Sequence, residues 1–237
     1  MNSVTGQLSE IERRLLTDAI TLAPKKPETV IEVGTWLGGG STLHILRALE
    51  KNGVGHLWGV EADRSIYERM VSNIRAAAPE ASKRFTPLFG FSDQVLPQWI
   101  KERGTGTQVD FAFLDGGNNP HEQIAEFRCL DPIIPIGGQL MAHDAKLRKG
   151  KWLGPFVSCL DNWETRLHDV SEEGLFFAKK IALHPSPGSS RAAQRQLLRM
   201  QCAPSEIAAA VLPSSVCGFF LRLLPRRFSR QLAEGRN

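Results

Sequence analysis

The chain has 237 residues, of which 42% are hydrophobic and 23% are charged. These proportions are close to the globular average, which excludes a wholly disordered or fibrous chain. No apolar run approaches the roughly 18 residues of a membrane-spanning helix, and the first residues lack the apolar core of an export signal, so we expect a cytoplasmic protein. The four cysteines are far apart without a CxxC pair, which predicts neither a zinc site nor a disulfide framework.

The net charge of +4 is unevenly distributed along the chain. Residues 184–237 hold eight arginines and two glutamates, a net +6, which leaves −2 for residues 1–183. The basic character therefore belongs to the last part of the chain. For this reason we do not expect the rest of the protein to bind a polyanion such as nucleic acid.

Apolar side chains at helical spacing alternate with short apolar runs along the chain. An amphipathic helix is expected first, over residues 7–23. Strands are then predicted over 29–33, 56–60, 85–89, 109–114 and 139–142, and helices between them over 41–51, 64–78, 95–101 and 121–130. Strands that alternate with helices imply right-handed crossovers and a parallel sheet covered on both faces.

The pattern changes near Trp163. Residues 166–170 and 175–182 are predicted as an antiparallel pair of strands on the edge of the same sheet. The fold class is therefore α/β, with a Rossmann-like, doubly wound, mostly parallel seven-stranded sheet and an antiparallel edge hairpin over residues 1–183. Residues 184–190 are expected to be a linker, and the remainder up to residue 237 a helical, basic tail.

In open α/β sheets, ligands bind beyond the carboxyl ends of the strands. The first predicted strand ends in EVGTWLGGGS, where glycines allow a tight turn and close approach of a ligand. The bulky Trp36 interrupts the GxGxxG pattern of a dinucleotide site, which counts against NAD. Glu61 ends the second strand, where a carboxylate could bind both hydroxyls of a ribose.

Polar side chains also follow the fourth and fifth predicted strands. Asp115 leaves the fourth strand and His143 and Asp144 leave the fifth, so the three are expected to converge at neighbouring strand ends as the catalytic group. His143 is the first candidate for a general base and His121 the alternative, because histidine is suited to proton transfer near neutral pH. Equally, His143 could serve only to hold the strand end by hydrogen bonds.

The ordered segments EVGTWLGGGS, LWGVEAD, LFGFSDQVLPQW, VDFAFLDGG and GGQLMAHD resemble a class I S-adenosylmethionine-dependent methyltransferase of the catechol O-methyltransferase-like group. The resemblance covers about residues 7–183. It implies that S-adenosylmethionine is the cofactor and that Asp115 lies near it. It further implies a methionine site lined by Glu32, Gly34, Thr35 and Gly38, a ribose contact from Glu61 and an adenine contact from Ser92.

The same resemblance implies that Asp115 and Asp144 hold a divalent metal, for which Mg²⁺ is the candidate. Two positions differ from the family pattern: Ala145 stands where an asparagine ligand is usual, and Asn118 where a lysine base is usual. The function expected is methyl transfer to an oxygen of a small molecule. The alternative is a catalytically inactive, methyltransferase-like binding module.

Within the segment 203–232, apolar residues at helical spacing are interleaved with arginines over residues 216–232. Such a segment can lie on an anionic membrane surface, or it can pack on a protein partner or on a second copy of the chain in a homodimer. The sequence leaves these alternatives open.

Overall fold

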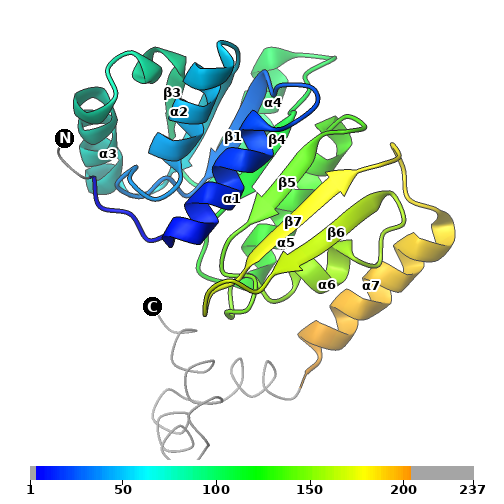
Figure 1. The fold of residues 1–237 in the computed structure, drawn as a ribbon. Helices are drawn as coiled ribbons and strands as arrows, with labels where there is room; N and C mark the ends of the chain where they lie inside the picture. The colour runs from blue at the N-terminus through cyan, green and yellow to red at the C-terminus, as the bar shows by residue number, and fades with distance from the viewer. Residues whose placement is uncertain (1–3, 204–237) are drawn as a thin grey trace, which may run out of the picture.

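The computed structural model describes residues 4–203, which form an α/β domain with one mixed sheet (Figure 1). The helices are α1 (Glu10–Thr21), α2 (Thr42–Asn52), α3 (Arg64–Ala77), α4 (Ser92–Arg103), α5 (Pro120–Leu130), α6 (Leu153–Val157) and α7 (Pro187–Gln201). The strands are β1 (Thr29–Val33), β2 (His56–Glu61), β3 (Phe85–Phe89), β4 (Phe111–Leu114), β5 (Gln139–Ala142), β6 (Trp163–His168) and β7 (Leu175–Lys180). Two short 3-10 helices, η1 (Ala81–Arg84) and η2 (Asp131–Ile133), complete the set.

The seven strands follow the order β3-β2-β1-β4-β5-β7-β6. β1 to β5 are mutually parallel, whereas β7 runs antiparallel to both β5 and β6. The strand order reverses between β1 and β4, which is where ligands bind in such sheets. The predicted doubly wound sheet with an antiparallel edge hairpin is therefore confirmed.

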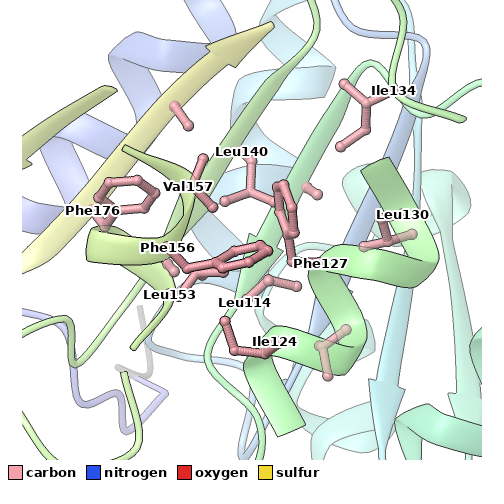
Figure 2. Packing of buried hydrophobic residues seen from close by; sticks show 14 of the residues in the cluster. Leu114, Ile124, Phe127, Leu130, Ile134, Leu140, Leu153, Phe156, Val157 and Phe176 are labelled. Carbon is pink, nitrogen blue, oxygen red and sulfur yellow. The ribbon is translucent and has the colours of Figure 1, made fainter. Parts of the chain in front are cut away.

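Helices cover both faces of the sheet and form two apolar cores (Figure 1). Successive side chains of a strand point to opposite faces, so β4 contributes Phe111 and Phe113 to one core and Ala112 and Leu114 to the other. The first core includes residues of α1, α2 and α3, and the second includes residues of α4, α5, α6 and α7. Figure 2 shows the second core, in which the rings of Phe127 and Phe156 meet edge to face at 6.0 Å between centroids.

Helix α1 begins with a capping box. The Ser9 hydroxyl accepts a hydrogen bond from the Glu12 backbone N–H at 3.3 Å, and the Glu12 carboxylate accepts one from the Ser9 N–H at 2.9 Å. Two backbone N–H groups at the helix start, those of Ser9 and Glu12, are thereby satisfied. Because Glu12 is only 1% exposed, this reciprocal pair also fixes the carboxylate at an interior point of the fold.

Several element boundaries differ from the prediction. The first strand of the edge hairpin begins at Trp163 rather than at residue 166, and α6, a helix of five residues, was not predicted at all. Residues 187–190, predicted as part of a linker, form the first turn of α7. The Ser186 hydroxyl caps that turn by accepting from the Ser189 N–H at 3.2 Å, and Leu197 of α7 packs into the core of the domain.

The basic segment predicted over residues 203–232 lies outside the described residues, apart from its first position. Within residues 4–203, none of the helices combines the length and the hydrophobicity that crossing a bilayer requires.

Candidate functional site

A cavity of about 750 Å³ opens at the carboxyl ends of β1, β2, β3 and β4. Its volume falls within the range of small-molecule sites. Five of the residues predicted for the site line it: Gly34, Glu61, Ser92, Asp115 and His121. They come from different strand ends or from the helix that follows β4, as the sheet topology requires.

The loop after β1 turns at Gly34, whose φ is +86°. A Cβ at this position would lie 2.5 Å from the Gly116 backbone nitrogen, so only glycine fits between the two loops. Trp36 has a positive φ of 45°, which is uncommon for a bulky residue. In this conformation its N–H donates to the Glu61 carboxylate at 2.9 Å.

The Glu61 carboxylate is therefore held at the cavity wall from two sides. Its other oxygen accepts from the Asp63 N–H at 3.1 Å. A carboxylate oxygen can accept more than one hydrogen bond, so Glu61 keeps acceptor capacity toward the cavity. Glu61 thus lies on the cavity wall at the end of β2, where the sequence predicted a contact with the ribose of an adenosine cofactor.

Three other residues expected to line the methionine site do not line the cavity: Glu32, Thr35 and Gly38. Glu32 is fully buried and accepts a hydrogen bond from the Ser41 hydroxyl, and burial raises the pKa of its carboxyl to about 8. Gly38 packs on α3, since a Cβ there would lie 2.8 Å from the Ile74 side chain. Glu32 and Gly38 therefore pack behind the loop, and the contact of these three residues with the methionine part of the cofactor stays a prediction.

The start of the chain crosses the same loop. A Cβ on Gly39 would overlap the backbone carbonyl oxygens of Val4 and Thr5, and one on Gly6 would overlap the backbone of Gly39. Gln7, which follows this crossing, lines the cavity. The glycine-rich loop thus contacts the chain's own first residues as well as the cavity.

Ser92 lines the cavity beside a buried carboxyl group that sequence reasoning missed. The Ser92 hydroxyl donates to Glu126 Oε1 at 2.7 Å. Burial raises the pKa of Glu126 to about 7, and among the described residues its second oxygen has no hydrogen-bond partner. Glu126 lies on α5 and lines the cavity. The sequence did not indicate this, because an acidic residue on a predicted helix is usually exposed to solvent.

Asp115, His143 and Asp144 come together as predicted, because β4 and β5 are paired in register up to Leu114 and Ala142. The Nδ1 atom of His143 lies 3.3 Å from a carboxylate oxygen of Asp115 and 3.3 Å from one of Asp144. Its Nε2 atom lies 3.3 Å from Glu12 Oε1. Glu12, from α1, was not predicted, and only its place in the SxxE capping box distinguishes it in the sequence.

The surroundings of His143 favour the second of its two expected roles, in which it holds the strand end rather than acting as a general base. Burial alone would lower its pKa, but the three carboxylates around it outweigh burial and raise the pKa to about 12. At neutral pH the ring is therefore an imidazolium, which has no lone pair with which to accept a proton. It is also buried and does not line the cavity. Its contacts with Asp115, Asp144 and Glu12 connect the ends of β4 and β5 to helix α1.

Lys149, also unpredicted, lies on the loop after β5 and lines the cavity. Its Nζ atom is 3.1 Å from Asp115 Oδ1 and 2.5 Å from Asp144 Oδ2. Burial would lower the pKa of Lys149, but the two carboxylates outweigh it and raise the pKa above its usual value. Nothing in the sequence pattern of this loop indicated that Lys149 returns to these carboxylates.

The candidate metal ligands have the right chemistry for a divalent cation. The atoms that Asp115, His143 and Asp144 could offer to an ion lie within 4.8 Å of one another. The His143 imidazolium has no free lone pair, so the two carboxylates are the groups that could bind an ion. The two carboxylates are the hard oxygen donors that Mg²⁺ prefers, so the group is consistent with Mg²⁺ as a cofactor. An ion between them would meet the Lys149 ammonium at the same oxygens.

The loop after β4 presents His121 to the cavity. Asn119 caps α5 by accepting from the His121 N–H at 3.0 Å, and Glu122 accepts from the Asn118 N–H at 2.7 Å. The exposed His121 ring meets the buried Trp152 ring edge to face, 4.6 Å between centroids. Among the described histidines, His121 lines the cavity whereas His143 does not.

Comparison with known proteins agrees with this architecture. Residues 31–145 match the family model described as a methyltransferase domain. The sequence matches no curated protein.

Solved structures share the fold at low sequence identity. An O-methyltransferase from Bacillus cereus in complex with S-adenosylhomocysteine is 19% identical, with a TM-score of 0.57 over 73% of this chain and 82% of that chain. A methyltransferase from Geobacter sulfurreducens is 17% identical, with a TM-score of 0.55 over 74% and 81%. An rRNA methylase from Streptococcus thermophilus is 11% identical, with a TM-score of 0.55 over 73% and 95%.

The family match spans β1 to the end of β5, the part of the sheet that forms the cavity. Residues 31–145 therefore match a methyltransferase domain, and the chain shares its fold with solved methyltransferase structures.

Proposed function

We propose that this protein is an S-adenosylmethionine-dependent methyltransferase that transfers a methyl group to an oxygen of a small-molecule acceptor. The observation that carries the proposal is the cavity of about 750 Å³ lined by Gly34, Glu61 and Asp115. Its wall contains both the turn at Gly34, which has no space for a side chain, and the Glu61 carboxylate at the end of β2. The first suits close approach of a cofactor, and the second suits the two hydroxyls of a ribose.

Methyl transfer from a sulfonium quenches the positive charge on sulfur, so the protein mainly has to align the acceptor oxygen with the methyl group. A base is needed when the acceptor arrives protonated. His121 is the candidate for this role, because its exposed ring lies on the cavity wall.

Calorimetric titration of the full chain with S-adenosylmethionine and S-adenosylhomocysteine tests the proposal. We expect one-to-one binding of both. Glu61→Ala should weaken both affinities at least about tenfold, because it removes hydrogen bonds to a charged acceptor. Glu68→Ala, which removes an exposed carboxylate on the neighbouring helix α3, is the matched control and should bind normally.

A radiolabelled methyl donor then tests transfer to phenols and other hydroxyl compounds. Absence of cofactor binding would contradict the proposal. Cofactor binding without transfer to any acceptor would favour the alternative, a binding module that has lost turnover.

A further inference from the structure

The strongest unexplained feature of the site is a side-chain cation between its two aspartates. The Lys149 ammonium reaches three oxygens: Asp115 Oδ1 at 3.1 Å, the Asp115 backbone carbonyl at 3.1 Å and Asp144 Oδ2 at 2.5 Å. An ammonium has three N–H donors, so these oxygens use its full donor capacity. Two of the three oxygens belong to carboxylates of the candidate metal group.

The loop that carries Lys149 is folded back on Asp144. Asp144 has a positive φ of 57°, and its carbonyl accepts from the Leu147 N–H at 2.9 Å. The Lys146 N–H donates to the Glu173 carbonyl at 2.8 Å, which fixes the same loop to the turn between β6 and β7. A Cβ on Gly150 would overlap the Asp144 carbonyl, so the loop closes tightly after Lys149. Lys149 is thus directed to the carboxylates by a well-connected loop rather than by a freely moving one.

We propose that Lys149 is a built-in cation that takes the place of a divalent metal between Asp115 and Asp144. The chain itself then supplies one positive charge between the two carboxylates, and an ion binds there only when the ammonium is displaced. The position of Ala145 agrees with this, because alanine offers no side-chain oxygen next to Asp144. Two partly buried carboxylates at close range repel each other, so a positive charge between them stabilises the pair.

Lys149 also restricts the methyl acceptor, a step that rests on the proposed methyl transfer. A metal ion with open coordination positions can bind two adjacent oxygens of one acceptor. The Lys149 ammonium has its donors engaged by the protein and does not chelate. The acceptor class is therefore one that presents a single reacting oxygen, with no requirement for a neighbouring hydroxyl.

Titration of the full chain with MnCl₂ tests the role of Lys149 without involving methyl transfer. Mn²⁺ is used because it prefers the same oxygen ligands as Mg²⁺. The wild-type protein should show no one-to-one binding at submillimolar concentrations. Lys149→Met should bind one Mn²⁺ at least roughly tenfold more tightly, because a positive charge has been removed from between the ligands. Lys146→Met is the matched control: it removes a lysine of the same loop that pairs with the exposed Asp169, and it should gain no site.

The outcomes separate clearly. One-to-one Mn²⁺ binding by the wild type with the affinity of Lys149→Met would overturn the inference, as would a Lys149→Met variant with native circular dichroism that gains no binding. If that variant does not fold, electron paramagnetic resonance of Mn²⁺ with the wild-type protein decides. A bound signal at submillimolar Mn²⁺ overturns the inference, and free Mn²⁺ alone supports it. None of these measurements depends on S-adenosylmethionine, so their result is independent of whether the proposed methyl transfer occurs.

Discussion

Replacing Glu12 tests whether a helix-capping residue also holds the site together. One oxygen of Glu12 accepts from the Ser9 N–H, and the other accepts from the Ser171 hydroxyl at 2.6 Å and lies 3.3 Å from His143 Nε2. Glu12→Gln keeps the shape of the side chain and removes its charge. The His143 imidazolium then loses one of its three carboxylates while remaining buried.

The expected loss follows from the pKa of Glu12. Burial would raise this pKa, but the contacts with His143, Ser171 and Ser9 outweigh burial and lower it from 4.5 to about 2. That difference corresponds to about 3 kcal/mol of stability at pH 7. The value agrees with the roughly 3–5 kcal/mol lost when one partner of a buried ion pair is removed.

The sign of the pH dependence is also fixed. Because the folded-state pKa of Glu12 is lowered, its contribution is complete above about pH 4.5 and is lost as the pH falls through about 2. The difference in unfolding free energy between the wild type and Glu12→Gln should thus decrease from about 3 kcal/mol at pH 7 to roughly 1 kcal/mol at pH 3.

Urea unfolding followed by circular dichroism at both pH values measures this difference. Asp18→Asn is the control on the same helix, because its pair with Arg14 is exposed and 3.8 Å long and should cost less than about 0.5 kcal/mol. A loss below about 1 kcal/mol for Glu12→Gln at pH 7, or an equal loss at pH 7 and pH 3, would refute the reasoning.

Two further substitutions test the cavity wall. Gly34→Ala should be less stable to unfolding than Gly104→Ala, and it should lose S-adenosylmethionine binding in calorimetry. Both glycines have a positive φ, but a Cβ at Gly34 would overlap backbone atoms, whereas a Cβ at Gly104 would meet nothing within 4 Å. Equal losses of stability in the two variants would show that the positive φ alone, which costs about 1–3 kcal/mol, explains why glycine is needed at position 34. His121→Gln should lower kcat roughly 10²–10⁴-fold with an unchanged cofactor affinity, as expected for loss of a general base, whereas His44→Gln on α2 should not. An unchanged kcat for His121→Gln would remove His121 from the mechanism.

The sheet was predictable because its signals are local. The strands 29–33, 85–89 and 139–142 agree with the structure at both ends, since short apolar runs are bounded by turn residues. Helix α6 was missed because five residues carry too little periodicity to be distinguished from a loop.

The electrostatics of the site depend on contacts between residues far apart in sequence, and so they were not predictable in the same way. Asp115 could be predicted to lie beside His143, because neighbouring parallel strands end at the same edge of the sheet. It could not supply Glu12, which arrives from a helix packed across the sheet, or Lys149, which depends on the path of an irregular loop. The pKa of His143 depends on Glu12 as well as on the two aspartates, so its direction could not be predicted from the strand ends alone.

The crossing of residues 4–6 over Gly39 changes how mutations in the glycine-rich loop must be interpreted. A side chain at position 39 would first collide with the protein's own backbone, at Val4 and Thr5, before any ligand is involved. Weakened binding in Gly39→Ala would therefore report a displaced amino-terminal segment, including Gln7 on the cavity wall, rather than a lost cofactor contact. A glycine that looks like part of a nucleotide motif is required here by self-packing.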